Sequence, residues 1–108
     1  MAVKVDGFEW DQGNWPKCGK HGVPRDEIEA LFENGPAVYP DSAHSQSEER
    51  MLAIGKAASG RFILVAFTLR RTNDEARIRP ISARYMRRKE IEHYEQQQQI
   101  ETAAPPQR

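Results

Sequence analysis

The stretch at residues 62–69, which reads Phe-Ile-Leu-Val-Ala-Phe-Thr-Leu, constrains the fold of this chain more than any other segment. Its residues are almost all apolar, and most are β-branched or aromatic, the types that favour strands. A nearly continuous apolar strand is typical of the centre of a sheet, where both of its faces are covered or nearly so. The chain therefore builds a sheet around this segment, and its 108 residues correspond to one domain.

Turn residues on both sides of this strand predict that the chain folds back on itself as an antiparallel meander. Ala58-Ser59-Gly60 separates it from a short apolar strand at residues 51–54. Polar residues 71–75 separate it from an alternating strand at residues 76–83. Pro80 removes one hydrogen-bond donor from that last strand. We therefore expect the strand to lie at an edge or to carry a bulge there.

Helical patterns flank the predicted sheet. Residues 24–34 begin with a proline, carry acidic residues in the first turn and end at a glycine followed by a proline, which predicts a helix. Residues 86–99 repeat larger side chains at helical spacing and predict the last helix. Residues 15–21 predict at most a short helix, because a proline and a glycine interrupt it, and residues 8–10 alternate like a short first strand.

This order of elements predicts the α+β class, with a short N-terminal strand, one or two helices, an antiparallel sheet and a C-terminal helix. We assign residues 1–100 to a single domain and expect the polar tail from residue 101 to be disordered. No apolar run is long enough for a membrane span, the N-terminus lacks the apolar core of a signal peptide, and Cys18 has no partner for a disulfide. These features favour the cytoplasm.

Charge is distributed unevenly along the chain although the formal net charge is zero. Residues 1–60 carry 6 basic and 10 acidic side chains, residues 61–89 carry 9 basic and 2 acidic ones, and residues 90–108 carry 1 basic and 4 acidic ones. A basic block between acidic segments points to a polyanionic partner such as nucleic acid. The alternative interpretation is that these charges are the solvated faces of strands and helices.

The basic block fits the chemistry of RNA cleavage without a metal ion. That reaction needs a base for the 2′-hydroxyl proton, an acid for the leaving 5′-oxygen and cations that stabilise the charged phosphorus. Arginine suits the last role because its planar fork binds phosphate oxygens in pairs and stays charged. The candidate arginines are Arg70, Arg77, Arg79, Arg84, Arg87 and Arg88. Arg77 and Arg79 share one face of their strand by the alternation of side chains.

Candidates for proton transfer lie outside the basic block. His21 titrates near neutrality and follows Lys20, a further cation, although a histidine there is also explained by packing at a helix end. Glu49 is a candidate base that is equally suited to pairing with an arginine. His44 and His93 are weaker candidates, in a polar loop and on a charged helix face. No ligand spacing predicts a metal site, no motif implies a cofactor, and a nucleophilic role for the lone cysteine is a remote alternative.

Several short stretches resemble the BrnT toxin family in its order and near its spacing. They are Phe8-Glu9-Trp10-Asp11, Lys20-His21-Gly22-Val23, the segment from Asp41 to Ser45, Glu49-Arg50, Ile54-Gly55, and Arg77 to Arg84 followed by Glu90 and Tyr94. Together they span about residues 8–94.

This resemblance implies a RelE-like ribonuclease fold and a type II toxin that blocks translation by cleaving RNA. It also implies neutralisation by a BrnA-like antitoxin, whose ribbon-helix-helix part binds operator DNA. The site residues it implies are Lys20, His21, Glu49, Arg79, Ser82 and Arg84, with Tyr94 as support.

Two other functions compete with the toxin. A catalytically inactive protein- or RNA-binding module of the same fold would keep the basic patch, with His21 and Glu49 remote from the arginines. An unrelated DNA-binding protein is a weaker alternative, because the predicted helix at residues 24–34 is acidic and makes a poor recognition helix.

Overall fold

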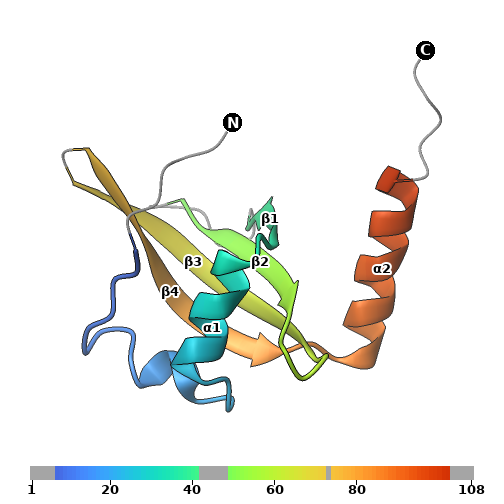
Figure 1. Ribbon diagram of the computed structural model, residues 1–108, viewed down its shortest axis with the longest axis horizontal. Coiled ribbons are helices and arrows are strands. Elements are labelled where there is room, and N and C mark those ends of the chain that lie inside the picture. The colour runs from blue at the N-terminus through green and yellow to red at the C-terminus, as the bar shows by residue number, and fades with distance from the viewer. Residues whose placement is uncertain (1–6, 42–48, 73, 103–108) are drawn as a thin grey trace.

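The computed structural model describes residues 7–41, 49–72 and 74–102 and places them in a four-stranded sheet with two α-helices and a short 3-10 helix (Figure 1). The elements in chain order are η1 (Lys17–Gly19), α1 (Arg25–Glu33), β1 (Ala37–Pro40), β2 (Met51–Lys56), β3 (Phe62–Thr72), β4 (Glu75–Tyr85) and α2 (Arg88–Thr102). The strands are antiparallel and neighbours in the order β1-β2-β3-β4. The predicted α+β class and antiparallel meander are therefore confirmed.

The predicted central strand is β3, which lies between β2 and β4. Its residues Ile63, Val65 and Phe67 are buried on the side of the sheet that α1 covers, which we call the α1 face. Phe67 meets Phe32 of α1 edge to face, with ring centroids 4.9 Å apart. Full burial of each such side chain contributes roughly 1.5–3 kcal/mol. This packing is what holds α1 on the sheet.

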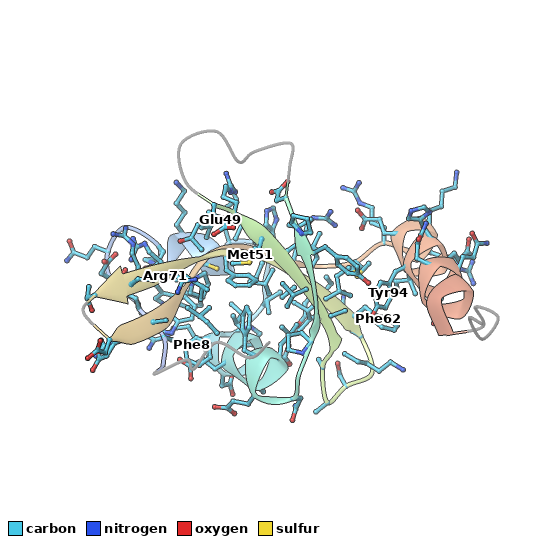
Figure 2. All side chains as sticks on the ribbon, turned by 90° about the horizontal axis from the view of Figure 1, so that it is seen from above. Phe8, Glu49, Met51, Phe62, Arg71 and Tyr94 are labelled. Carbon is cyan, nitrogen blue, oxygen red and sulfur yellow. The ribbon has the colours of Figure 1, made fainter. Side chains whose placement is uncertain are left out.

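The opposite face of β3 carries Leu64, Ala66 and Thr68, because successive side chains alternate. Ala66 and Thr68 are buried, whereas Leu64 is only half-buried. The α2 helix does not lie across this face. It stands beyond the end of the sheet, set apart from the strands in both views (Figures 1 and 2). The second face is therefore covered less completely than the sequence predicts for a central strand.

A register shift between β3 and β4 confirms the irregularity expected at Pro80. Phe67 pairs with Pro80, but the preceding residue, Ala66, pairs with Ser82, so Ile81 is an extra residue in the outer strand. A proline fits such a bulge because it has no N–H to donate. The strand also lies last in the sheet order, so both parts of that expectation hold.

The segment at residues 7–9 covers part of the outer edge of β4. Its Phe8 forms an isolated parallel bridge with Ile78, where Glu9 N donates to Ile78 O (2.8 Å) and Ile78 N donates to Gly7 O (2.9 Å). The predicted first strand is thus reduced to a single bridge. The chain turns away after it because the buried Asn14 side chain donates to Glu9 O and Pro80 O, both at 2.9 Å, and fixes the following loop against β4.

The first α-helix follows its sequence signals closely. It begins after Pro24, has Asp26 and Glu27 in its first turn, and is followed by Gly35 at φ 72°, a left-handed conformation that suits glycine. The weak pattern at residues 15–21 forms only the 3-10 turn η1. The last helix begins at Arg88 and continues to Thr102, where the sequence placed it at residues 86–99.

One strand, β1, was not expected from the sequence. It is short, and Pro36 and Pro40 bracket its apolar residues, so the segment resembles a turn. Within the described residues, the helices lack the length and apolar character needed to cross a bilayer.

Candidate functional site

The bulge in β4 gathers the candidate arginines and Ser82 on one face of the sheet. Thr68 lies opposite Arg79, Ala66 opposite Ser82, and Leu64 opposite Arg84. Directly opposed residues of paired strands share a face, and these three β3 residues alternate onto the same side. Arg79 and Arg84 are five positions apart, so they would point to opposite faces if every residue between them were paired, and the unpaired residue of the bulge brings them onto one face. We call this side of the sheet the arginine face.

Two further arginines belong to the same face. Arg70 and Arg77 lie opposite each other on the part of β3 and β4 that extends beyond β2, and both are exposed. The predicted sharing of a face by Arg77 and Arg79 is therefore confirmed. Arg77 contacts Glu75 at 3.4 Å. Arg71 pairs with Ala76 and so points to the α1 face, away from this group.

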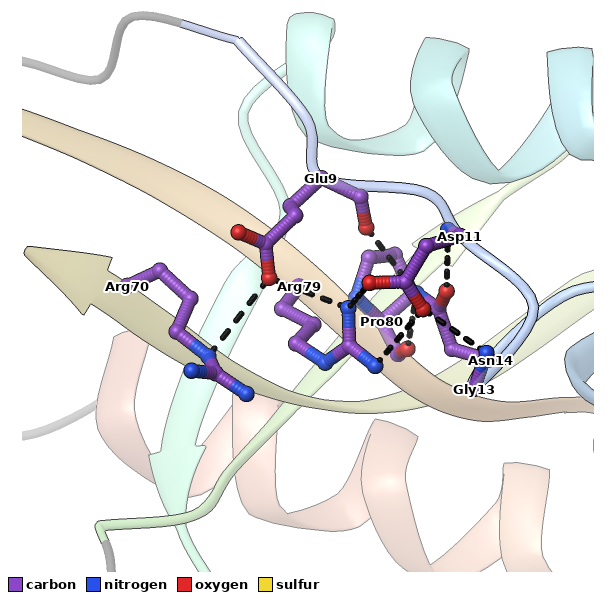
Figure 3. A network of polar contacts seen from close by, with 7 residues as sticks. All are labelled: Glu9, Asp11, Gly13, Asn14, Arg70, Arg79 and Pro80. Atoms are coloured by element: carbon purple, nitrogen blue, oxygen red, sulfur yellow. Dashed lines mark hydrogen bonds and ion pairs between the residues drawn. The ribbon is translucent and has the colours of Figure 1, made fainter.

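Arg79 is held by two carboxylates from the segment that runs along β4 (Figure 3). Its Nη1 donates to Glu9 Oε1 (3.0 Å) and Asp11 Oδ2 (2.9 Å), and its Nη2 donates to Asp11 Oδ1 (3.0 Å). The side chain is only 15% exposed. Hydrogen bonds from Arg79 and from the Gly13 N–H lower the pKa of Asp11. Arg70 also contacts Glu9 at 3.5 Å, which extends the network.

Arg84 is held differently, by a single carboxylate from α2. Its Nη1 and Nη2 donate to the two carboxylate oxygens of Glu90, at 2.8 and 2.7 Å. Glu90 also accepts the Arg87 backbone N–H at 2.9 Å. These donors, Arg84 first, lower the pKa of Glu90 to about 2, and the carboxylate raises the pKa of Arg84 in return. The Arg84 side chain is 36% exposed.

A groove of about 540 Å³ lies between the arginine face and α2. Tyr39, Leu52, Ile54 and Leu64 line it from the strands. The helix side is lined by Met86, Lys89, Glu90, His93, Tyr94 and Gln97. Tyr94 meets Phe62 edge to face, with ring centroids 5.8 Å apart, and Figure 2 shows both residues between the sheet and α2. The Arg84–Glu90 pair thus stands beside the groove, because Leu64 and Glu90 both line it.

The remaining candidates take no part in the ion pairs of Arg79 and Arg84. Lys20 and His21 are exposed in the turn after η1, and Glu49 is exposed just before β2 (Figure 2). The structure shows no hydrogen bond or ion pair from these three side chains to any other residue it describes. Arg87 and Arg88 are exposed at the start of α2. His44 lies outside the described residues.

The structure adds residues that the sequence analysis missed or ranked low. Glu9 and Asp11 entered only as part of a motif and were not candidates, yet they bind Arg79 across 70 and 68 positions of sequence. His93, which the sequence placed on a charged helix face, lines the groove. The sequence pattern that could have indicated Glu9 and Asp11 is their alternation with two aromatic residues in residues 8–11.

The arrangement offers cations and hydrogen-bond donors for an anionic ligand. Four guanidinium groups on one face already contact carboxylates, and Arg84 does so with the paired fork geometry that also fits phosphate. Cys18 is buried, and burial raises the pKa of its thiol to about 11, which disfavours a reactive thiolate. Among the described residues, no group of three or more His, Cys, Asp or Glu side chains is placed to hold a metal ion.

Comparison with known proteins gives one match. The family described as the ribonuclease toxin BrnT of type II toxin-antitoxin systems matches residues 10–90, well over half of the chain. A search of curated proteins found no match.

Proposed function

This chain belongs to the BrnT family of type II ribonuclease toxins, and from that premise we propose that it is an endoribonuclease that stops translation by cleaving RNA at the arginine face. We further propose a RelE-like, metal-independent mechanism acting in the cytoplasm. The arginines take the place of a metal ion because they are permanently charged and bind phosphate oxygens in pairs.

The observation that carries this proposal is the geometry of Arg84. Its guanidinium group donates to both carboxylate oxygens of Glu90, at 2.8 and 2.7 Å, and Glu90 lines the groove. A non-bridging pair of phosphate oxygens presents a similar target. In the reaction the RNA 2′-oxygen attacks the adjacent phosphorus, the 5′-oxygen leaves, and Arg84 stabilises the extra negative charge of the transition state.

The other candidate residues keep roles that substitution has to test. Arg79 adds positive charge to the same face of the sheet. Ser82 lies between Arg79 and Arg84 along β4. Tyr94 supports the site from α2. Lys20, His21 and Glu49 remain candidates for proton transfer. Four exposed arginines are candidates for contacts with the RNA backbone. Those arginines are Arg70, Arg77, Arg87 and Arg88.

A type II toxin has a protein antitoxin, and we propose that the antitoxin of this chain is BrnA-like. Its ribbon-helix-helix part would bind operator DNA, and an acidic or apolar segment would cover residues 61–89. The support for this is the excess of basic side chains in that block, 9 against 2 acidic ones.

The activity is tested directly with the purified chain and a defined RNA in the presence of EDTA. We expect cleavage that leaves 2′,3′-cyclic phosphate ends, and induction of the chain in a bacterium should stop amino-acid incorporation. Cleavage that requires added Mg²⁺ would contradict the metal-independent mechanism. RNA that stays intact both with EDTA and with added Mg²⁺ would contradict the ribonuclease activity.

A specific observation favours one alternative, a binding module without catalysis. The arginines Arg70, Arg77, Arg79 and Arg84 all have carboxylate partners, and none of these ion pairs includes Lys20, His21 or Glu49. A folded chain that binds RNA or an antitoxin, yet cleaves nothing and leaves translation running, would establish this alternative.

A further inference from the structure

The groove between the sheet and α2 is open, and its floor is apolar. Leu52, Ile54 and Leu64 form this floor on the arginine face, and all three are only half-buried. Met86 and Tyr94 add apolar surface from the helix side. The helix itself does not fill the groove, because it stands beyond the end of the sheet (Figures 1 and 2). Apolar side chains that gather at an open surface indicate a site where another molecule binds.

A second copy of this chain offers little that would cover the groove. Among the side chains that the structure describes, the large apolar one that is exposed is Val38, at 48%. A single valine does not cover three aliphatic side chains and an aromatic ring. The family provides another source, because a type II toxin has a protein partner, its antitoxin. An apolar occupant therefore comes from that second protein.

The backbone of the sheet determines the form that such a segment takes. The floor belongs to β2 and β3, and each of these strands is already paired with a neighbour on both sides. An extended segment lying there would bury its own N–H and C=O groups without partners, which is costly. A helix pairs these groups internally and presents apolar side chains along one face. The groove follows α2 from Lys89 to Gln97, which corresponds to about two helical turns.

Charges at the rim determine what lies beside that apolar face. Lys89 lines the groove, and the ammonium group of Lys56 lies 5.1 Å from the centroid of the Phe62 ring, which contacts Tyr94. Neither lysine forms an ion pair with another residue that the structure describes. The carboxylate of Glu90 also lines the groove but is already paired with an arginine. The rim therefore carries positive charge that is complementary to an acidic partner.

We propose that this groove binds a helix of the antitoxin, which is apolar along about two turns of one face and carries acidic residues beside that face. The inference rests on the proposed function, because it names where the antitoxin of this toxin binds. Leu64 of the floor lies opposite Arg84, so the docked helix covers the side of the sheet that carries the proposed catalytic cation. It neutralises the toxin by keeping RNA away from Arg84, without having to displace Glu90.

Three designed helical peptides of equal length test this surface. The first carries leucines along one face with glutamates beside them. The second has the same residues with the leucines spread around the helix, and the third has lysines in place of the glutamates. We expect the full chain to bind the first peptide about tenfold or more tightly than either of the others. The methyl NMR signals of Leu52, Ile54 and Leu64 should shift with the first peptide.

Two matched pairs of variants locate the binding. Ile54→Glu puts a charge on the floor and should weaken binding of the first peptide about tenfold or more, whereas Val38→Glu puts the same charge on the α1 face and should not. Lys89→Glu changes an exposed residue of α2 and should weaken that binding roughly fivefold. Arg71→Glu makes the same change of charge on the α1 face and should have no effect. Variants of a pair that bind equally overturn the proposal.

Competition identifies the natural occupant. The antitoxin protein, co-expressed and purified with the chain, should prevent binding of the first peptide. A complex with the antitoxin that still binds this peptide overturns the proposal, and so do equal affinities for the three peptides. Displacement of the peptide by a non-cleavable 2′-O-methyl RNA overturns it in favour of a nucleic-acid site. Methyl shifts that follow the concentration of the chain alone overturn it in favour of a contact between copies.

RNA cleavage by the free chain separates this inference from the proposed function. Cleavage without peptide binding in the groove overturns the docking site and leaves the ribonuclease standing. Peptide binding that the antitoxin prevents, without any cleavage by the free chain, supports the docking site and overturns the ribonuclease in favour of a binding module.

Discussion

Arg79 and Arg84 lie on the same face of the same strand, yet the protein holds them in contrasting ways. Arg79 is 15% exposed and is bound by two carboxylates of a segment that is itself fixed to β4 by backbone hydrogen bonds. Arg84 is 36% exposed and is bound by a single carboxylate on a helix that stands away from the sheet (Figure 1). The two residues therefore differ in what a ligand has to displace.

This difference separates a structural role from a functional one. A phosphate that reached Arg79 would have to displace both Glu9 and Asp11, and with them the attachment of the N-terminal segment. At Arg84 it would displace Glu90 alone. We therefore assign Arg79 chiefly to the fold and Arg84 to the substrate, although the sequence ranked them equally.

Inserting one alanine after Ala83 should have the largest effect, because it breaks the spacing that places the two arginines on one face. Deleting Ile81 would not do so, since it leaves a regular ladder in which Arg79 and Arg84 stay on one face. With the insertion, either Arg84 lies opposite Ile63 and turns toward the buried α1 face, or the residues before it shift and Arg79 turns there instead. We expect loss of the cooperative thermal transition and of all RNA cleavage. An insertion variant that melts and cleaves like the wild type would show that this spacing does not set the site.

Arg79→Ala should lower stability more than activity. It leaves Glu9 and Asp11 close together without their shared cation, so the segment along β4 loses its anchor. We expect a melting temperature several degrees lower, and a cleavage rate per folded molecule within about tenfold of the wild type, well short of the loss typical of a group that stabilises transition-state charge. A variant with normal melting and no cleavage would reverse the two assignments.

The sequence predicted the parts of this arrangement that local patterns determine. The apolar run at residues 62–69, the helix after Pro24 and the sharing of a face by Arg77 and Arg79 all follow from side-chain spacing along one element. Pro80 indicated an irregularity, but not that an extra residue there would align two arginines. The partners of Arg79 come from nearly 70 positions away, which no local pattern encodes.

Acid titration should sharpen the description of Arg84. The ion pair holds the pKa of Glu90 near 2, below its ordinary 4.5, so its stabilisation is complete above 4.5 and is lost as the pH falls through about 2. We expect the side-chain carboxyl carbon of Glu90 to titrate near 2 by NMR, and to move toward 4.5 in Arg84→Ala. A midpoint that stays the same in the variant would mean that Arg84 is not its partner in solution.

Glu90→Gln should have the smallest effect and the opposite direction. The amide keeps the size of the side chain but no longer competes as an anion for Arg84, so RNA binds more easily. We expect KM to fall by roughly two- to fivefold with kcat little changed, on the scale of a single exposed ion pair. A lower kcat with an unchanged KM would instead make Glu90 a residue that positions Arg84 for catalysis.

The central claim, that the arginine face is the catalytic surface and Arg84 its main cation, is tested by the single-turnover cleavage rate of Arg84→Ala beside Arg71→Ala. The control removes the same charge from an exposed arginine of the neighbouring strand that points to the other face. We predict that Arg84→Ala lowers the rate roughly 100- to 1000-fold with near-normal melting, whereas Arg71→Ala cleaves like the wild type. Equal rates for the two variants would contradict the claim.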